Sequence, residues 1–434
     1  MSKKSVKLAQ PESIDDIPAD TTKKSKIKPP KNSIQNKRKK RIIIAVVIIL
    51  ILCAIGGTVT ALYFLVWNKP KEEAPQEEPA LEPEAPKIYS KLTGLEIASE
   101  EENSMPLYCM QIPNGADGPR PQTGLNEAGV VFEAIAEAGI TRFAAVFQNP
   151  QSKTLGPIRS LRLYYLDWDT PFDCAIVHAG GSAEAVAAAS SGAYHDLSES
   201  AVYMWRDYNS YWAPNNLMTS PELLAKFARD DGYNSANPQT FPRLTPKEAE
   251  EKVESARSAA NPESTDDEQT NCASGGDTNC ITPAPVPLVT DITVNFGSVP
   301  TFNTVYKYDA DSNTYKRSYA SGEEHLVYDC SGSEKSEPSP KQDCGIAKQI
   351  APSAIAVMMV DERLDSDNYH HVIQTIGTGV AYVFQNGTVT KGTWKKTAKN
   401  AQIIFSDEQV NIISFTPGQL WISAIPNYGG SVKY

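Results

Sequence analysis

The sequence predicts an α+β protein, in which one transmembrane helix precedes an N-terminal α/β-type domain and a C-terminal mostly β domain. Three features of the 434 residues lead to this prediction. An uncharged apolar run covers residues 42–67, β-rich runs alternate with helix start signals in residues 88–243, and short strand-like runs dominate residues 287–434. A chain of this length can hold two or three ordinary domains.

Charge is distributed unevenly on the two sides of the apolar run. Residues 1–41 hold 13 Lys/Arg and 4 Asp/Glu, a net of +9, so the remaining residues, with 28 Lys/Arg and 48 Asp/Glu, carry −20. We expect the basic tail to be disordered and to lie in the cytoplasm. The acidic remainder lacks the basic surface that nucleic-acid binding requires, so no nucleic acid is expected as a partner.

The apolar run is long enough to cross a membrane. Its 26 residues, Ile42 to Trp67, reach ~39 Å at ~1.5 Å per residue, against a hydrocarbon core of ~30 Å. The basic residues 37–41 directly before it place the N-terminus in the cytoplasm by the positive-inside rule. A cleaved signal peptide is the main alternative, but the basic region and the apolar run are both long for one. Lipid attachment at Cys53 is disfavoured by the bulky Leu52 before it. We therefore predict an uncleaved single-pass anchor of the cell membrane.

Beyond the membrane, residues 68–87 are rich in Pro and Glu and predict a stiff stalk. The N-terminal domain is expected over residues 88–243. Ser220-Pro221-Glu222 is a strong helix start there, because Ser can cap, Pro fits the first helical position and Glu favours the helix dipole. Its other predicted elements are a hairpin of residues 129–137 and 140–148 around Ala138-Gly139, a short helix at 159–167, a buried strand at 174–178 and an Ala-rich helix at 183–189.

Residues 244–286 are predicted to form a charged helix followed by a flexible insertion. Thr245-Pro246 repeats the helix start signal, whereas residues 257–285 have too few apolar side chains for a core. The β-rich domain follows over residues 287–434. Within it, Asn386-Gly387 is the favoured two-residue type I′ turn of a hairpin, and further strands are expected near residues 403–405 and 420–425.

Six cysteines lie beyond the membrane, and an even number in an oxidising compartment suggests disulfides. Cys272 with Cys280, and Cys330 with Cys344, each flank a polar loop, so local pairing is expected. Cys109 and Cys174 lie in more apolar surroundings and could equally be free buried thiols.

The stretch from Cys174 to Ser190 is a candidate anion site. A buried strand ends at His178, Gly180-Gly181 makes a tight turn, and a helix begins near Ser182. Such a turn directs backbone N–H groups and the positive end of the helix dipole at one point. The alternative, which a lone Gly-Gly pair favours, is that the glycines only connect a strand to a helix.

Three arginines form a second candidate. A three-residue spacing places Arg159 and Arg162 on one face of the predicted helix, and Arg142 lies in the second strand of the predicted hairpin. Guanidinium groups bind carboxylate or phosphate in a bidentate way and stay charged at any working pH. An equally weighted alternative is internal ion pairing with acidic residues, namely Glu133, Glu137, Asp167 or Asp169.

Catalysis is the less favoured interpretation. A hydrolase would use His178 with Ser182 or Glu133, but no G-x-S-x-G motif is present. His370 and His371 would face opposite sides of a strand, and no HExxH motif occurs, so neither a metal nor a cofactor is predicted.

Several joined motifs resemble the YerB-like bacterial envelope lipoprotein family, in which no function is established. They are PRPQTGLNEAGVVFEAIAEAGITRFAAVFQ, GPIRSLRLYYLDW and VHAGGSAEAV, followed by GTGVAYVFQNGTVTKGTWKK and PGQLWISAIP. The resemblance implies a two-domain extracytoplasmic protein held at the membrane, and it carries over no catalytic residue. This chain differs from the family pattern in the large residue before Cys53 and in the polar insertion around Cys272 and Cys280.

Together these features predict an envelope protein that binds an anionic ligand or a surface polymer. The alternatives are an envelope hydrolase and an interaction scaffold without a ligand pocket. The candidate ligand-binding residues are Glu133, Arg142, Arg159, Arg162, His178, Gly180, Gly181 and Ser182.

Overall fold

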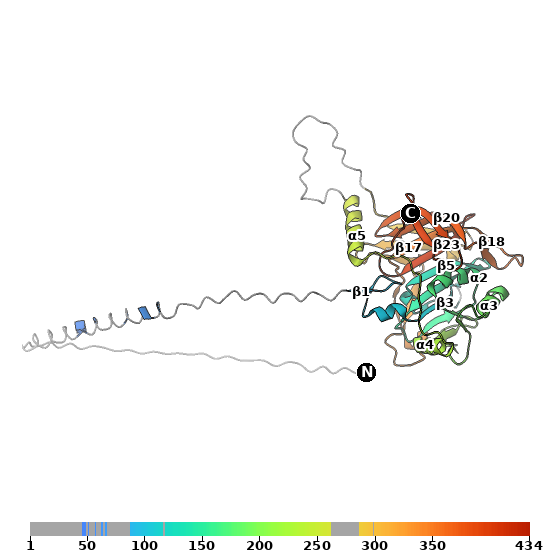
Figure 1. Ribbon diagram of the computed structural model, residues 1–434, viewed down its shortest axis with the longest axis horizontal. Coiled ribbons are helices and arrows are strands. Elements are labelled where there is room, and N and C mark those ends of the chain that lie inside the picture. Colours follow the sequence, from blue (N-terminus) through green and yellow to red (C-terminus); the bar gives the residue numbers. More distant parts are fainter. Residues whose placement is uncertain are drawn as a thin grey trace, which may run out of the picture. The chain divides into compact units, whose positions relative to one another are not determined.

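The computed structural model describes residues 87–115, 118–261, 286–297 and 299–434, and a few single positions between residues 46 and 66 (Figure 1). In these parts of the chain, no helix is both long and apolar enough to span a bilayer. The predicted tail at 1–41, most of the membrane helix at 42–67, and the stalk up to residue 86 lie outside the described residues. The same holds for residues 262–285, and with them for the predicted pairing of Cys272 with Cys280.

A mixed sheet of ten strands forms the centre of residues 87–434, in the order β22-β21-β20-β17-β23-β5-β6-β3-β8-β9. Strands from both predicted domains therefore share one sheet, and the junction is the parallel pairing of β23 with β5 (Figure 1). The prediction of a mixed α+β protein is confirmed. The bounds are β3 Leu107–Pro113, β5 Val130–Glu137, β6 Ile140–Gln148, β8 Ala175–His178, β9 Asp196–Ser198, β17 Ala354–Val360, β20 Gly377–Gln385, β21 Thr388–Lys396, β22 Ile404–Asp407 and β23 Leu420–Pro426.

The other strands form smaller sheets. A six-stranded sheet has the order β10-β11-β7-β4-β15-β16, a four-stranded sheet the order β14-β13-β12-β24, and two pairs are β1-β2 and β18-β19. Their bounds are β1 Ile88–Tyr89, β2 Glu96–Ile97, β4 Gln122–Thr123, β7 Leu155–Ile158, β10 Trp205–Arg206, β11 Leu217–Thr219, β12 Asp291–Asn295, β13 Thr304–Asp309, β14 Thr314–Tyr319, β15 Leu326–Asp329, β16 Gly345–Gln349, β18 Glu362–Leu364, β19 His371–Ile373 and β24 Ser431–Lys433.

Both predicted hairpins are confirmed. The turn between β5 and β6 has φ angles of 47° at Ala138 and 76° at Gly139, and the turn between β20 and β21 has 55° at Asn386 and 69° at Gly387. Two successive residues with positive φ give the type I′ turn, whose twist matches that of the flanking strands. Glycine at the second position tolerates this conformation without steric cost.

The helices are α2 Leu163–Asp169, α3 Ala183–Ala189, α4 Pro221–Asp230, α5 Pro246–Ala260 and α6 Pro340–Asp343. Two predicted starts are confirmed. The hydroxyl of Ser220 accepts a hydrogen bond from the N–H of Leu223 at the start of α4. Thr245 and Glu248 form a complete capping box at the start of α5. Such side chains satisfy the backbone N–H groups that a helix leaves free at its start.

The predicted helix at 159–167 is wrong at its beginning, because the first helical residue is Leu163. The preceding residues are bonded to other segments instead. The N–H of Arg159 donates to the carbonyl of Gln111 at 2.7 Å, and the N–H of Leu161 donates to the carbonyl of Gly180 at 2.9 Å. Backbone groups that are paired in this way cannot also form a helical turn, so Arg159 and Arg162 do not share a helix face.

The core lies on both faces of β5 and β6. On one face, Phe132 stacks on Trp168 of α2 with ring centroids 5.5 Å apart. On the other, Phe143 contacts Trp421 of β23 edge-on at 5.1 Å. Since both faces are covered, all eight residues of β5 are buried. This explains its nearly continuous apolar sequence.

Two disulfides are present among the described cysteines. Cys330 pairs with Cys344, which confirms the predicted local pairing. Cys109 of β3 pairs with Cys174 just before β8, which decides between the two alternatives left open for these residues.

Candidate functional site

An irregularity in the β5–β6 hairpin positions the first charged pair. The strand register shifts between Ile135 and Glu137, close to the turn. A bulge of this kind interrupts the alternation of side chains between the two faces of a sheet. As a result Glu137 and Arg142 lie together, and the guanidinium of Arg142 donates a hydrogen bond to Oε1 of Glu137.

Arg162 approaches the same carboxylate from the segment before α2. Its Nη2 donates to Oε2 of Glu137 at 2.6 Å, so each carboxylate oxygen has its own guanidinium partner. Both arginines also hold backbone carbonyls: Arg142 Nη1 donates to Ser160 O at 2.9 Å, and Arg162 Nη1 donates to Leu161 O at 2.8 Å. All three side chains are at least nine-tenths buried. For these two arginines the structure therefore shows internal pairing.

Arg159 differs from its two neighbours. Its side chain is half-buried, and its guanidinium makes no hydrogen bond or ion pair with any residue in the described part of the chain. Its backbone is nevertheless fixed, because its N–H donates to Gln111 and its carbonyl accepts from the N–H of Ala179 at 3.0 Å. We call Glu137, Arg142, Arg159 and Arg162 the arginine cluster. Three guanidinium groups against one carboxylate give it a formal charge of +2.

The electrostatics of the cluster follow from burial and from this excess of positive charge. Burial raises the pKa of Glu137, but Arg142 and Arg162 outweigh burial, and the net pKa lies below the usual value. Partial burial, followed by the positive charge of Arg142, lowers the pKa of Arg159. Arginine still stays protonated at working pH. A bound anion would therefore stabilise the charged form of Arg159.

The C-terminal half of the chain reaches the cluster through the β18–β19 hairpin. The N–H of Ala138 donates to the carbonyl of Tyr369 at 3.0 Å, and Glu137 forms an isolated antiparallel bridge with His370. Beside them lies a small cavity of about 90 Å³. It is lined by Arg162, Leu163, Tyr164, Asp167, Ser182, Glu184, His370, His371, Val372 and Ile373.

His178 and the Gly-Gly turn form a separate structural unit. Nδ1 of His178 faces the carbonyl of Gly180 at 2.7 Å, and Nε2 faces Oδ1 of Asp196 at 2.8 Å. Gly180 has a φ of 64°, and a Cβ on Gly181 would lie 2.8 Å from the carbonyl oxygen of Leu161. Backbone conformation and close packing thus account for both glycines.

At the start of α3, the backbone N–H of Ser182 is already paired, and the Ser182 side chain does not cap the helix. The N–H of Ser182 donates to Leu161 O at 3.2 Å, and its side chain makes no capping hydrogen bond. Helix α3 has only seven residues. An anion at this turn therefore stays a prediction.

Glu133 lies in a different polar cluster, inside the protein. Its carboxylate accepts hydrogen bonds from Arg317, from Nε1 of Trp421 at 2.9 Å and from Thr141 at 3.0 Å. Among the described contacts it has none with His178. Neither pairing that a hydrolase would require, His178 with Ser182 or with Glu133, is present among these contacts.

The sequence did not lead us to Arg317, which belongs to this buried cluster. One signal for it exists. In β14, Tyr315, Arg317 and Tyr319 alternate with more exposed residues, so the arginine lies on the apolar face of the strand. A charged residue on such a face implies a buried partner. The sequence does not show which residue this is, because Glu133 lies 184 residues away.

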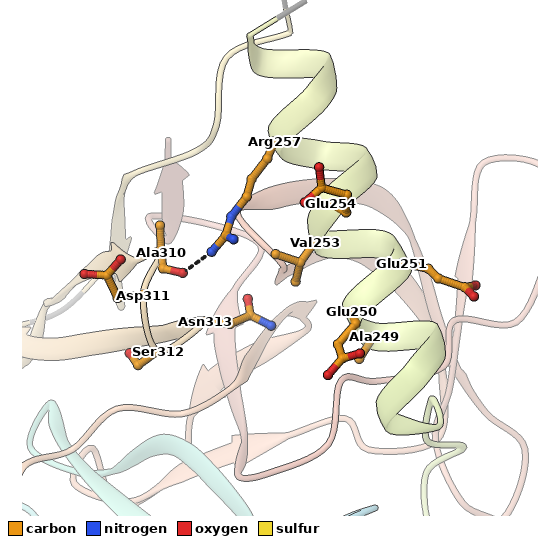
Figure 2. A pocket seen from close by; sticks show the side chains of 10 residues that line it. All are labelled: Ala249, Glu250, Glu251, Val253, Glu254, Arg257, Ala310, Asp311, Ser312 and Asn313. Carbon is orange, nitrogen blue, oxygen red and sulfur yellow. Dashed lines mark hydrogen bonds between the residues drawn. The ribbon is translucent and has the colours of Figure 1, made fainter. Parts of the chain in front are cut away.

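A wider groove of about 520 Å³ lies elsewhere, between α5 and the turn that joins β13 to β14 (Figure 2). In Figure 2, Arg257 extends from α5 to the carbonyl of Ala310, whereas Glu251 points away from that turn. Its charged lining is mostly acidic, with Glu250, Glu254 and Asp311 beside the single arginine. This groove does not suit an anion.

Comparisons with known proteins agree with this architecture. Residues 92–234 match the family model described as the N-terminal domain of DUF3048, a protein of unknown function, and residues 292–422 match the C-terminal domain of the same family. The chain is similar to YerB of Bacillus subtilis (strain 168), described as a candidate lipoprotein, with 26% identity over 360 residues that cover 81% of this chain and 90% of YerB. The crystal structure of YerB from B. subtilis shares the fold, with a TM-score of 0.59 and 24% identity over 80% of this chain and 100% of the solved chain.

Proposed function

The chain belongs to the DUF3048 family of YerB-like proteins, and from this premise we propose that it is a membrane-associated extracytoplasmic protein that binds an anionic ligand through Arg159. The matched domains cover both halves of the fold, so the proposal concerns the whole extracytoplasmic part. We further propose that the apolar run at residues 42–67 is its membrane anchor, with the N-terminus in the cytoplasm.

Three observations support the location. The disulfides Cys109–Cys174 and Cys330–Cys344 are typical of an oxidising compartment. The similar protein YerB is described as a candidate lipoprotein, which places that relative at a membrane. The uncharged run of 26 residues could attach this chain to a membrane without a covalently bound lipid.

The ligand class is inferred from one observation: Arg159 carries a half-buried guanidinium on a fixed backbone, without a hydrogen-bond or ion-pair partner among the described residues. Arg142 and Arg162 already share Glu137, and they leave the surroundings of Arg159 positive. A guanidinium has five N–H donors in a planar fork, which matches the oxygens of carboxylate or phosphate. A cationic ligand would be repelled at this position. An anionic small molecule or an anionic envelope polymer would be attracted.

The proposal is tested by removing this one cation. The full-length chain in detergent is titrated with inorganic phosphate and with polyphosphate, and binding is followed by calorimetry. We expect Arg159→Ala to weaken binding at least about tenfold, since one charge-assisted contact contributes roughly 1.5–3 kcal/mol. Arg159→Lys keeps the charge but loses the planar fork, and should bind with intermediate affinity.

A matched control separates this site from general surface charge. Arg229→Ala removes an exposed arginine of α4 and should leave binding unchanged. Thermal unfolding of Arg159→Ala should stay close to that of the wild type, because its guanidinium supports no described contact. Arg162 is unsuitable for this purpose, since its replacement would leave Glu137 with one partner fewer. Equal binding by wild type and Arg159→Ala would overturn the proposal.

A further inference from the structure

A small cavity is lined by α4, by β3 and by the segment that follows β6. Its volume is about 230 Å³, which is below the roughly 300–1,000 Å³ of pockets for drug-sized ligands. Helix α4 contributes Pro221, Ala225 and Arg229, which follow one another at intervals of four residues and therefore lie on one face of the helix. The remaining lining residues are Met105, Pro106, Tyr108, Asn149, Pro150 and Asn234.

Hydrogen bonds hold the walls of this cavity in place. The N–H of Leu107 donates to the hydroxyl of Tyr233 at 2.9 Å, and the N–H of Ala236 donates to the carbonyl of Ser104 at 3.0 Å. These two bonds join the start of β3 to the segment that follows α4. Three of the nine lining residues are prolines, whose rings fix φ and which have no N–H to satisfy. The cavity therefore has rigid walls that are apolar over much of their surface.

Two polar side chains of the lining have no hydrogen-bond or ion-pair partner within the described part of the chain. Tyr108 is only 5% exposed, and its hydroxyl makes no hydrogen bond there. Burial raises the pKa of Tyr108 to about 12, so the hydroxyl keeps its proton and can donate it to an acceptor. Arg229 lies on the exposed side of the lining, and its guanidinium is equally without a partner among the described residues. A buried hydroxyl that bonds nothing is costly, and a ligand with an acceptor group would remove that cost.

We propose that this cavity binds a small carboxylate with an apolar body, whose carboxylate accepts hydrogen bonds from Arg229 and Tyr108 while its apolar part packs against the prolines. A cavity of this size is small enough for one ligand to contact both donors. Guanidinium and phenol groups both donate, and a carboxylate offers the acceptors that they need. A cation would be repelled by Arg229, and a purely apolar molecule would leave both donors unpaired. An inorganic anion has no part that packs against apolar walls, so phosphate should gain little here.

The test uses 3-phenylpropionate and two matched probes, each titrated by calorimetry into the full-length chain in the same detergent. Acetate keeps the carboxylate but lacks the ring, and 3-phenylpropanamide keeps the ring but lacks the charge. We expect the wild type to bind 3-phenylpropionate at least about tenfold more tightly than either of the other two probes, because only this probe makes both the apolar and the charge-assisted contacts.

Three variants assign this binding to the cavity. Arg229→Ala should remove the preference for the carboxylate over the amide, and Tyr108→Phe should weaken binding of 3-phenylpropionate about threefold or more. Ala225→Leu should abolish binding, because it places a larger side chain in the cavity while leucine still favours the helix. Thermal unfolding of each variant verifies that it is folded. Lys226→Ala is the matched control and should bind as the wild type does, since Lys226 is next to Ala225 in α4 but does not line the cavity.

Several outcomes would overturn this inference. They are no binding of 3-phenylpropionate to the wild type, equal binding of the carboxylate and the amide, and equal binding by wild type and Ala225→Leu. A loss of 3-phenylpropionate binding in Arg159→Ala, with full binding in Arg229→Ala, would also overturn it, because the ligand would then belong to the arginine cluster. The cavity and the arginine cluster share no residue, so the phosphate titration of Arg159→Ala decides the proposed anion site independently.

Discussion

Glu133 of β5 and Arg317 of β14 form an ion pair in which neither side chain is exposed, although 184 residues separate them in the sequence. Two Glu133 oxygens accept from Nη2 of Arg317, at 3.0 and 2.9 Å, and the guanidinium lies 4.6 Å from the ring of Trp421. Burial alone would lower the pKa of Arg317, but Glu133 and neighbouring tyrosines raise it above its usual value. Arg317 therefore stays protonated, and the ion pair joins the regions matched by the two family models.

We predict that breaking this pair strongly destabilises the fold. Glu133→Gln or Arg317→Met leaves one buried charge without its partner, which costs about 3–5 kcal/mol in the free energy of unfolding. The measurement is urea denaturation of the full-length chain. As a control, Lys226→Ala breaks an exposed ion pair with Asp230 and should change stability very little. Similar losses for the buried and the exposed pair would contradict this prediction.

His325 gives a prediction of pH dependence. It is buried between Arg317 and Gln122, and burial, followed by the charge of Arg317, lowers its pKa well below the usual 6.5. The neutral ring can accept from Arg317 at Nδ1 and donate to Gln122 at Nε2, 2.9 Å away. A lowered pKa in the folded state means that stability is complete above about pH 6.5 and is lost as the pH falls toward the folded pKa.

The expected slope for His325 is up to about 1.4 kcal/mol per pH unit below pH 6.5. His325→Gln has no titrating ring and should lack this component, although it is less stable at neutral pH. The measurement is the free energy of unfolding of both proteins between pH 5 and pH 7.5. Parallel curves for wild type and variant would show that His325 does not titrate with unfolding.

Asp169 should show the opposite dependence. It is fully buried at the end of α2, its Oδ2 accepts from Nε2 of Gln111 at 3.2 Å, and burial raises its pKa well above the usual 3.8. A raised pKa in the folded state means that the stability contribution is complete below about pH 3.8 and is lost as the pH rises through the folded pKa. Asp169→Asn has no ionisable group at this position, so it should not lose stability in this way as the pH rises.

We therefore expect Asp169→Asn to gain stability relative to wild type as the pH rises from 4 to 7, by up to about 1.4 kcal/mol per pH unit. Thermal unfolding at several pH values measures this difference. Asp311→Asn, at an exposed turn, is the control and should follow the wild type at every pH. A constant difference between Asp169→Asn and wild type would refute the prediction.

The two described disulfides should differ in their contribution to stability. Cys109 and Cys174 are 65 residues apart, and Cys330 and Cys344 are 14 apart. A cross-link restricts the unfolded chain more when it closes a longer loop, which gives about 4 kcal/mol for the first pair and about 3 kcal/mol for the second. Guanidinium denaturation of the two Cys→Ala double variants measures both values. A larger loss for the 330–344 pair would show that loop closure does not dominate.

Local signals predicted a substantial part of the fold. Ala138-Gly139 marked one hairpin, and Asn386-Gly387 marked the other together with its type I′ turn, since a turn of two residues depends on the φ angles of those residues alone. Ser220 and Thr245 marked the starts of α4 and α5, because a cap bonds to residues only three positions away. These interactions lie within a few residues of the chain, so the sequence contains all the information they need.

The sequence-based predictions were wrong where hydrogen bonds to distant segments replaced local helical ones. The spacing of Arg159 and Arg162 fits a helix, yet bonds to Gln111 and Gly180 hold this segment extended. The pairing of Arg162 with Glu137 likewise depends on the bulge in β5, which the alternation of residues in that strand does not reveal. Residue type alone named Arg159 and Arg162 as candidates, which remain a prediction, while the helical geometry assigned to them was wrong.

The sequence by itself determined the two hairpin turns and the starts of α4 and α5, and it marked Arg142, Arg159 and Arg162 as candidates, because residue type and short-range spacing are sufficient for these. Only the tertiary structure decided that Arg142 and Arg162 both pair with Glu137, while Arg159 is left without a described hydrogen-bond or ion-pair partner. The reason is that electrostatic energy depends on distance through space and on burial, and both are set by strands that meet from remote parts of the chain.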